Sequence, residues 1–389
     1  MYDLVLKGGR VIDPASGFDG AADVAFKNGE VAARDADLDA SEAAEVRDVS
    51  GRIVAPGLID LHTHVYWGGT SIGVDPDDVG RLGGTTTLID AGTAGPANFP
   101  GFRRHVIEPA ETRVLAYINV AFPGIFAFSA QVMIGECVDI RLLNAPECLR
   151  VAREHADLIV GVKVRVGQTA SGSNGAMPLD IAIEVAEELG LPVMAHLDYP
   201  PPSRMEVLSR LRRGDILTHC FRPFPNAPVG PDRAPREETL AARERGVIFD
   251  IGHGKGSFGF ETAEGMLAGG FQPDCISSDV HTLSIDGPAY NILDTMSKFL
   301  HLGMPLADIV RATTVNPADA VRREDLGRLS PGLPGDATVL TIQDGRFDYE
   351  DARGNIRTGS QKIACAGIVL GGRWWHDGDT ANQSGMAAE

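Results

Sequence analysis

The sequence predicts an α/β protein: a (β/α)8 barrel with a small β-sandwich domain formed from both termini. Three observations lead to this fold. The middle of the chain alternates short apolar runs with helix-like segments, which is the pattern of a parallel α/β fold. Both ends carry short segments of alternating polar and apolar residues instead. The length of 389 residues is enough for one large barrel and a small accessory domain.

The small β domain is expected in residues 1–55 together with residues 330–376. In both regions Gly, Pro and Asn separate short strand-like segments. The expected strands are Tyr2–Leu6, Arg10–Ile12, Asp23–Phe26, Asp336–Ile342, Ile363–Leu370 and Gly372–Trp375. Because two similar ends flank a different middle, we expect both ends to fold together. The polar tail at residues 377–389 is expected to be disordered.

The barrel is expected in residues 56–329. Its eight strand candidates are Gly57–Val65, Thr85–Ala91, Arg113–Ala121, Leu158–Val166, Leu191–Leu197, Ile216–Cys220, Val247–Ile251 and Cys275–Val280. Helical patterns lie between most of them, for instance at Leu179–Leu189, Pro202–Arg212 and Arg236–Arg245. Eight β/α units predict a closed barrel, and a doubly wound open sheet is the structural alternative. The long apolar segment Phe122–Ile140 after the third strand is either a lid or a subunit contact.

Composition restricts the class of partner. Hydrophobic residues make up 43% of the chain and charged residues 23%, an ordinary balance for a globular protein. The formal charge of -18 argues against nucleic acid or an anionic membrane as the main partner. No run approaches the roughly 20 apolar residues of a membrane span, and the first residues do not resemble a signal peptide. Five cysteines without CxxC spacing suggest reduced thiols. We therefore expect a cytoplasmic homo-oligomer that acts on a small molecule.

Polar residues end several of the predicted barrel strands. The first strand ends in His62-Thr63-His64, and residues two apart on a strand point to the same side. Both imidazoles can therefore enter the barrel mouth and bind one metal ion. His196, His219 and Asp279 end the fifth, sixth and eighth strands. One buried histidine is more often a core residue than a ligand. Ligand-type side chains at the ends of several strands of one barrel predict a metal site.

Lys163 lies within the apolar fourth strand, LIVGVKVRV. The alternate valines from Val160 to Val166 are expected on one face against the helices, which leaves Lys163 and Arg165 on the inward face. A buried lysine is costly unless it is paired, neutralised or modified. It is either a salt-bridged lysine inside the barrel or a carbamate, an anion able to bridge two metals.

Four further residues are candidates for substrate binding, each with a structural alternative. Arg165 is suited to a bidentate contact with a carboxylate, or it pairs with an acidic residue of the protein. His253 in the sequence IGHG either meets substrate or packs in the core. His281 either orients Asp279 and touches substrate or is an ordinary rim residue. Tyr66 follows the histidine pair and is expected to form a wall of the pocket.

Taken together, PGLIDLHTH, Lys163, the two later histidines and SSDVH resemble the amidohydrolase superfamily. More specifically they resemble its dihydroorotase-like and deacetylase-like members with a binuclear metal site. The runs VNPADA and PGLPGDATVL resemble the segments by which such enzymes return to their β domain. The resemblance covers nearly the whole chain. It implies a barrel enzyme that hydrolyses an amide or ester bond.

The resemblance also implies roles for the ligand-type residues. His62 and His64 would bind a buried metal ion together with Asp279. Carbamylated Lys163 would bridge two divalent ions, and the second ion would be bound by two further histidines, His196 and His219. Zinc is the expected metal because imidazole and carboxylate suit it. Two such ions would lower the pKa of a bridging water toward neutrality, giving the attacking hydroxide, and Asp279 would carry the proton to the leaving group.

The substrate is predicted from one departure from the family pattern. Dihydroorotases typically carry an arginine two residues after the histidine pair, where this chain has Tyr66. We therefore expect a deacetylase of small N-acyl or O-acyl carboxylic acids, such as N-acetyl amino acids, with Arg165 holding the acid group. The alternatives are a cyclic-amide hydrolase of the dihydroorotase, dihydropyrimidinase or hydantoinase kind, and a non-catalytic scaffold relative. All six ligand positions are filled, which argues against the scaffold.

Overall fold

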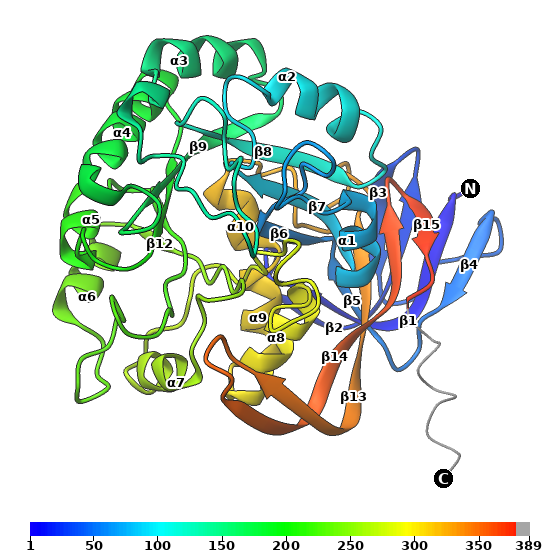
Figure 1. The fold of residues 1–389 in the computed structure, drawn as a ribbon. Helices are drawn as coiled ribbons and strands as arrows, with labels where there is room; N and C mark the ends of the chain where they lie inside the picture. Colours follow the sequence, from blue (N-terminus) through cyan, green and yellow to red (C-terminus); the bar gives the residue numbers. More distant parts are fainter. Residues whose placement is uncertain (379–389) are drawn as a thin grey trace.

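A computed structural model describes residues 1–378 and shows a parallel barrel beside a sheet built from both termini (Figure 1). Of the tail that the sequence predicts to be disordered, residues 379–389 lie outside the described residues.

The terminal sheet joins the two ends of the chain. Its strands are β1 (Leu4–Asp13), β2 (Phe18–Lys27), β3 (Glu30–Asp35), β4 (Glu45–Asp48), β5 (Ile53–Pro56), β13 (Ala337–Glu350), β14 (Ile356–Leu370) and β15 (Arg373–His376). β13 pairs antiparallel with β5, which connects the two halves. Two expected strands, Tyr2–Leu6 and Arg10–Ile12, are one strand with a register shift between Leu6 and Gly9. Gly8 has φ +77° at this shift, a conformation that glycine adopts without strain.

The barrel strands follow one another around a parallel sheet. They are β6 (Leu58–Thr63), β7 (Thr85–Ala91), β8 (Arg113–Asn119), β9 (Ile159–Val166), β10 (Val193–Leu197), β11 (Ile216–Leu217) and β12 (Ile248–Phe249). The spatial order equals the chain order from β6 to β12, without the reversal of a doubly wound sheet.

An eighth segment closes the barrel. Asp250 forms a parallel bridge with Cys275, and Thr63 forms one with Val280, so the segment Cys275–Val280 touches both edges of the sheet. The backbone N–H of His64 donates to Val280 O at 3.0 Å. The predicted eighth strand therefore lies where a strand is expected. It forms isolated bridges instead of a regular ladder, because Asp279 has φ +49° and interrupts the extended backbone.

Helices lie outside the strands, as Figure 1 shows for α3 to α6. The helices are α1 (Pro76–Gly83), α2 (Phe99–Phe102), α3 (Ala145–Glu154), α4 (Met177–Leu189), α5 (Arg204–Arg210), α6 (Glu237–Glu244), α7 (Phe260–Ala268), α8 (Ile292–His301), α9 (Leu306–Ala312) and α10 (Val315–Ala320). Short turns of other helix types occupy Arg103–Ile107, Ile140–Leu142 and Gly172–Asn174. In α4, Leu179, Ala182, Val185 and Ala186 are buried at helical spacing, and Gly190 ends the helix with φ 66°.

The predicted orientation of the β9 valines is correct for three of the four. Val162, Val164 and Val166 belong to the large outer core. Val160 belongs instead to the core inside the barrel, with Tyr117. A register irregularity between β8 and β9, next to Tyr117 and Gly161, changes the alternation at this point. Lys163 and Arg165 keep the inward orientation that the site needs.

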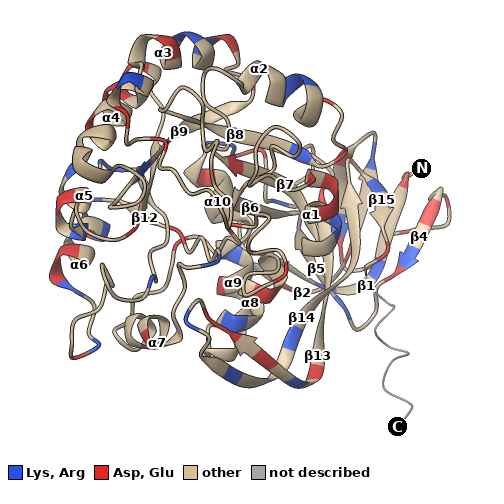
Figure 2. Ribbon diagram, in the orientation of Figure 1, with Lys and Arg blue, Asp and Glu red and all other residues tan. Residues whose placement is uncertain are grey.

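Charged residues of both signs are mixed along the outer helices, as Figure 2 shows for α3, α5 and α6. Among the described residues, no helix is long and apolar enough to cross a membrane.

Candidate metal centre

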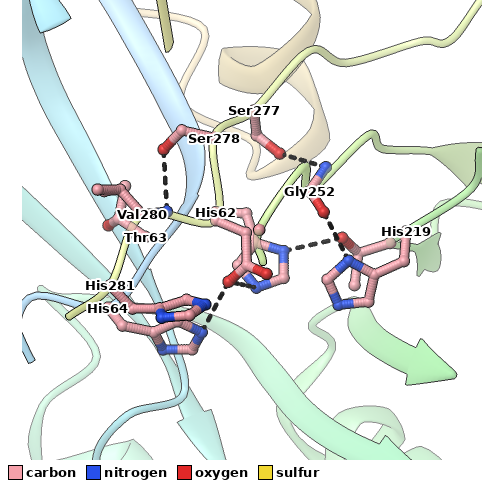
Figure 3. Close-up of polar contacts among 12 residues, drawn as sticks. His62, Thr63, His64, His219, Gly252, Ser277, Ser278, Val280 and His281 are labelled. Atoms are coloured by element: carbon pink, nitrogen blue, oxygen red, sulfur yellow. Dashed lines mark hydrogen bonds and ion pairs between the residues drawn. The ribbon is translucent and has the colours of Figure 1, made fainter. Parts of the chain in front are cut away.

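His62 of β6, His64 just after that strand and a carboxylate of the eighth segment converge at the carboxyl ends of the barrel strands. The Nε2 atom of His62 lies 3.3 Å from Asp279 Oδ1, and the Nε2 atom of His64 lies 3.2 Å from the same oxygen. The ligand atoms of these three residues lie within 4.8 Å of one another. Figure 3 shows both rings turned toward one place. This arrangement has the donor set and the spacing of a site for a divalent metal ion.

The Nδ1 atoms of both rings are hydrogen-bonded to threonine hydroxyl groups. His62 Nδ1 lies 2.8 Å from Thr218 Oγ1, and that hydroxyl donates to Asp250 Oδ2 at 2.7 Å. Because the hydroxyl proton goes to Asp250, the His62 Nδ1–H is the donor to Thr218, and Nε2 keeps its lone pair. His64 Nδ1 lies 2.7 Å from Thr93 Oγ1. The inward nitrogens are therefore the ones available to a metal.

A second pair of histidines lies beside the first. The ring centroids of His219 and His62 are 5.2 Å apart, and those of His196 and His219 are 4.5 Å apart. His219 Nδ1 donates to Gly252 O at 2.7 Å, which leaves its Nε2 as an acceptor. His196 Nε2 is buried and has no hydrogen-bond partner among residues 1–378. A buried unpartnered nitrogen is costly, and a metal ion would satisfy it. These residues therefore fit a second metal position.

The four imidazoles are neutral at physiological pH. Burial lowers the pKa of His64 to about 3. Burial also lowers the pKa values of the other three, His62, His196 and His219, well below the usual value. Neutral imidazole is the form that binds metals.

Lys163 points into the middle of this group. Its Nζ lies 3.3 Å from His62 Nε2 and 3.4 Å from Met194 Sδ. Among the described residues, no carboxylate lies within 4.0 Å of Nζ, so the salt-bridged alternative lacks its partner. Burial lowers the pKa of Lys163 to about 7. A fraction of the lysine is therefore the neutral amine, the form that reacts as a nucleophile.

Tight turns fix the ligands in place. His219 has φ +63° and Asp279 has φ +49°, both in the left-handed region that few non-glycine residues adopt. The Asp279 turn is supported by Asp60, which accepts from the Ser278 N–H at 3.0 Å and from the Ser278 hydroxyl. Gly252 has φ +47°, and a Cβ there would lie 2.9 Å from the Nδ1 atoms of both His62 and His219. Only glycine leaves room for both rings at this position.

One small cavity collects these groups. Its volume is about 30 Å³, and its lining residues are His62, His64, Ile72, Phe128, Lys163, Arg165, His196, His219, Asp279 and His281. Eight of the ten residues that the sequence singles out as site candidates are among them. The His281 ring lies 6.0 Å from that of His64, and its Nδ1 accepts from the Leu283 N–H at 3.1 Å.

Two predicted substrate-binding residues are absent from the lining of this cavity. The Tyr66 ring packs on Phe102 at 4.7 Å, because β6 ends at Thr63 and the alternation of sides ends with it. His253 is fully buried, and its Nε2 accepts from Lys298 Nζ at 2.7 Å. The turn at Gly252 directs this side chain away from the ligands.

Arg165 lies at the edge of the cavity without a hydrogen bond from its side chain. Its side chain is 6% exposed, and its Nε has no hydrogen-bond partner among the described residues. The guanidinium lies over the Phe128 ring at 5.0 Å, and Nε is 3.6 Å from Glu136 Oε1. A guanidinium has five N–H donors, so this one has unused capacity beside the metal ligands.

Sequence reasoning missed several residues that shape the site. Thr218 and Asp250 hold His62 through one hydrogen-bonded chain, and both lie within predicted strands, Ile216–Cys220 and Val247–Ile251. Phe128 and Glu136 lie in the long segment after β8, where no periodicity reveals which side chain faces the barrel.

Proteins of known name match this sequence over most of its length. A deacetylase of Agrobacterium fabrum is 37% identical over 333 residues, which are 85% of this chain and 80% of the relative. A deacetylase of Enterococcus faecalis is 31% identical over 377 residues, 96% of this chain and 98% of the relative. No protein-family model matches the chain.

Solved structures agree on the fold. A crystal structure of an adenine deaminase has a TM-score of 0.90 at 31% identity, and the match covers 97% of this chain and all of the other. A crystal structure of a dihydroorotase has a TM-score of 0.87 at 32% identity, and the match covers 96% of this chain and 99% of the other. The names differ in substrate, while each describes hydrolysis of a carbon–nitrogen bond.

Proposed function

The chain belongs to the amidohydrolase superfamily, and on that premise we propose that it removes acetyl groups from small N-acyl or O-acyl carboxylic acids. N-acetyl amino acids are the expected substrates. The members of the family share hydrolysis of a carbon–nitrogen bond with the help of divalent metal. The acyl group, the acid and the metal are what the proposal adds.

The metal part of the proposal assigns six residues. His62, His64 and Asp279 would hold one ion, and His196 and His219 would hold the other. Lys163, as a carbamate, would supply a shared anionic ligand. Lys163 has no carboxylate within 4.0 Å among the described residues, and this supports the carbamate, because the modification gives the buried side chain the negative charge that two cations need. Zinc is the proposed metal because the donors are imidazole and carboxylate. When bound, such ions lower the pKa of water and polarise the carbonyl that is attacked.

Asp279 handles the proton. Burial raises the pKa of its carboxyl group to about 6, so in the metal-free protein the group is ionised near neutral pH and is a stronger base than an exposed aspartate. It takes the proton of the attacking water and gives it to the leaving amine or alcohol. His281 lies near it in the same cavity and is positioned to contact the leaving group.

The observation that carries the substrate class is the guanidinium of Arg165 beside the ligand set, which faces Glu136 at 3.6 Å and donates no side-chain hydrogen bond among the described residues. A carboxylate that accepts from its terminal nitrogens would lie near the ligands, as an α-carboxylate of an N-acyl amino acid requires. The identity to two deacetylases over most of the chain supports the same class.

A cyclic-amide hydrolase is the second candidate, favoured by the structural match to a dihydroorotase. Against it stands Tyr66, which occupies the position where dihydroorotases carry arginine and packs on Phe102 outside the cavity. A non-catalytic scaffold is disfavoured because all six ligand-type residues line one cavity.

A hydrolysis screen tests the proposal. The purified protein is given N-acetyl and O-acetyl carboxylic acids of both hands, dihydroorotate and hydantoins, and acetate release and ring opening are measured. We expect acetate release. Ring opening without acetate release would show a cyclic-amide hydrolase in place of the proposed deacetylase. If no compound is turned over, the proposal that the protein is an enzyme is contradicted.

The proposal also includes the cellular compartment and the oligomeric state of the enzyme. We place it in the cytoplasm as a homo-oligomer acting on small molecules. All five cysteines are buried free thiols, which fits a reducing compartment. Exposed apolar side chains such as Val132, Ile134 and Ile140 lie on the segment after β8 and fit a subunit contact.

A further inference from the structure

The segment between β8 and α3 is held against the barrel at Glu136. The Cys137 N–H donates to Ala170 O at 3.1 Å, in the loop that follows β9. At Gly135 the backbone is packed so closely against Thr169 and Ala170 that a side chain would clash. Glu136 is therefore placed by its neighbours on both sides, although residues 130–134 are exposed.

The Glu136 carboxylate has no hydrogen bond in residues 1–378. Its exposed fraction is 1%, and both of its oxygens are inaccessible and lack a hydrogen-bond partner there. A buried carboxylate is costly unless a positive charge compensates it. That charge is Arg165, whose Nε lies 3.6 Å from Oε1.

The contact is longer than a direct charge-assisted hydrogen bond, which is about 2.7–2.9 Å. Glu136 thus faces the Nε of Arg165 without saturating the guanidinium. Phe128, from the same segment, covers one face of that group at 5.0 Å. Glu136 and Phe128 together restrain the arginine from two directions and leave its other N–H donors for the cavity.

We infer that Glu136 is a positioning residue for Arg165: it fixes the guanidinium so that a substrate carboxylate binds in the cavity lined by the proposed metal ligands. Arg165 touches the substrate and Glu136 acts through it. The inference rests on the proposed function and adds the residue that sets the preference for a free acid. The structural alternative is that the ion pair only ties the segment to the barrel.

Matched substrates separate the two roles. An N-acetyl amino acid and its carboxamide carry the same acetyl amide and differ in the carboxylate. We expect Glu136→Gln to raise KM for the acid at least about tenfold more than for the carboxamide, with kcat for the acid much less affected, because a charge-assisted contact loses its geometry. Glu136→Asp should recover part of the loss. Arg165→Gln should show the same selectivity, and the double variant should lose little more than Arg165→Gln alone.

Asp139→Asn is the matched control. Asp139 is in the same segment and forms an exposed ion pair with Arg141 at 2.6 Å. It should leave the acid-to-carboxamide ratio unchanged. A melting temperature for each variant reports a purely structural role.

The outcomes are distinguishable. If Glu136→Gln weakens both substrates equally and lowers the melting temperature, the ion pair is only a tie and the inference is wrong. If Arg165→Gln is selective for the acid and Glu136→Gln is not, Arg165 binds the substrate carboxylate without help from Glu136, and the inference is wrong. If the unmodified enzyme acts on neither substrate, the proposed function itself fails.

Discussion

At the scale of single residues, the site depends on the contrast between two buried lysines. Lys163 lies among imidazoles and a thioether, whereas Lys298 donates to three acceptors: His253 Nε2, Pro288 O and Glu350 O, at 2.7, 2.7 and 2.8 Å. The three acceptors of Lys298 match the three N–H groups of an ammonium. Lys163 lacks such a set, which is why it is the one we propose as carbamate.

Replacing each lysine by methionine tests this difference. Lys163→Met removes the bridging anion, and we expect at least about a hundredfold loss of affinity for one metal ion, with loss of hydrolysis. Lys298→Met destabilises the fold and should keep the metal content of the unmodified protein. Metal content after dialysis is the measurement. Equal metal retention in both variants would contradict a ligand role for Lys163.

Most ligand-type residues could be predicted because each ends a strand, and parallel strands end on the same side of a barrel. Tyr66 and His253 were also predicted at the site, but neither lines the cavity. Both follow a point where the chain leaves the extended backbone, and a period of two holds only within a strand. The left-handed conformations of His219 and Asp279 carry no signal in the sequence either.

At the scale of secondary-structure elements, Lys298 connects α8 to three other parts of the chain. Its acceptors come from the turn after β12, the loop before α8 and the end of β13. The β13–β14 hairpin is also tied to α8 by the Ile363 N–H, which donates to Ser297 Oγ at 2.9 Å. The terminal sheet thereby supports the rim of the barrel.

This connection makes a prediction about pH. Burial lowers the pKa of Lys298 to about 7 in the folded protein, against 10.5 for the ordinary side chain. Between these values the unfolded chain binds more protons, so this group makes the folded state more stable as pH rises from about 7 to 10.5. The unfolding free energy of the unmodified protein minus that of Lys298→Met should therefore increase across this range. Denaturant titrations at several pH values measure it, and parallel curves would be inconsistent with a lowered pKa.

The elements themselves were predicted with uneven success. Long apolar strands such as β7 have the bounds that the sequence suggests, because burial on both faces leaves a continuous signal. β11 and β12 have only two residues each, and the eighth segment forms isolated bridges. The left-handed conformations of His219 after β11 and of Asp279 in the eighth segment interrupt the extended backbone, a constraint that local propensity does not encode.

At the scale of the whole molecule, the two-part architecture was predictable because the two ends and the middle have different periodicities. The eight-stranded sheet from both termini and the closed barrel confirm it. The domain boundaries stay a prediction. The segment after β8 could not be placed from sequence, because its position depends on contacts with the loop after β9 and with Ser71.

The cavity of about 30 Å³ has room for ions and water and is too small for an acyl amino acid. Since Phe128 and Ile72 form its apolar walls, substrate entry requires movement of at least one of them.

Metal analysis coupled to acetate release tests the central claim most directly. The purified protein is analysed for metal, stripped with a chelator and reloaded with zinc, and acetate release from an N-acetyl amino acid is followed at each stage. We expect close to two ions per chain, loss of hydrolysis on stripping and its return on reloading. Hydrolysis that persists in fully stripped protein, or a protein that neither contains nor takes up metal, would contradict the account.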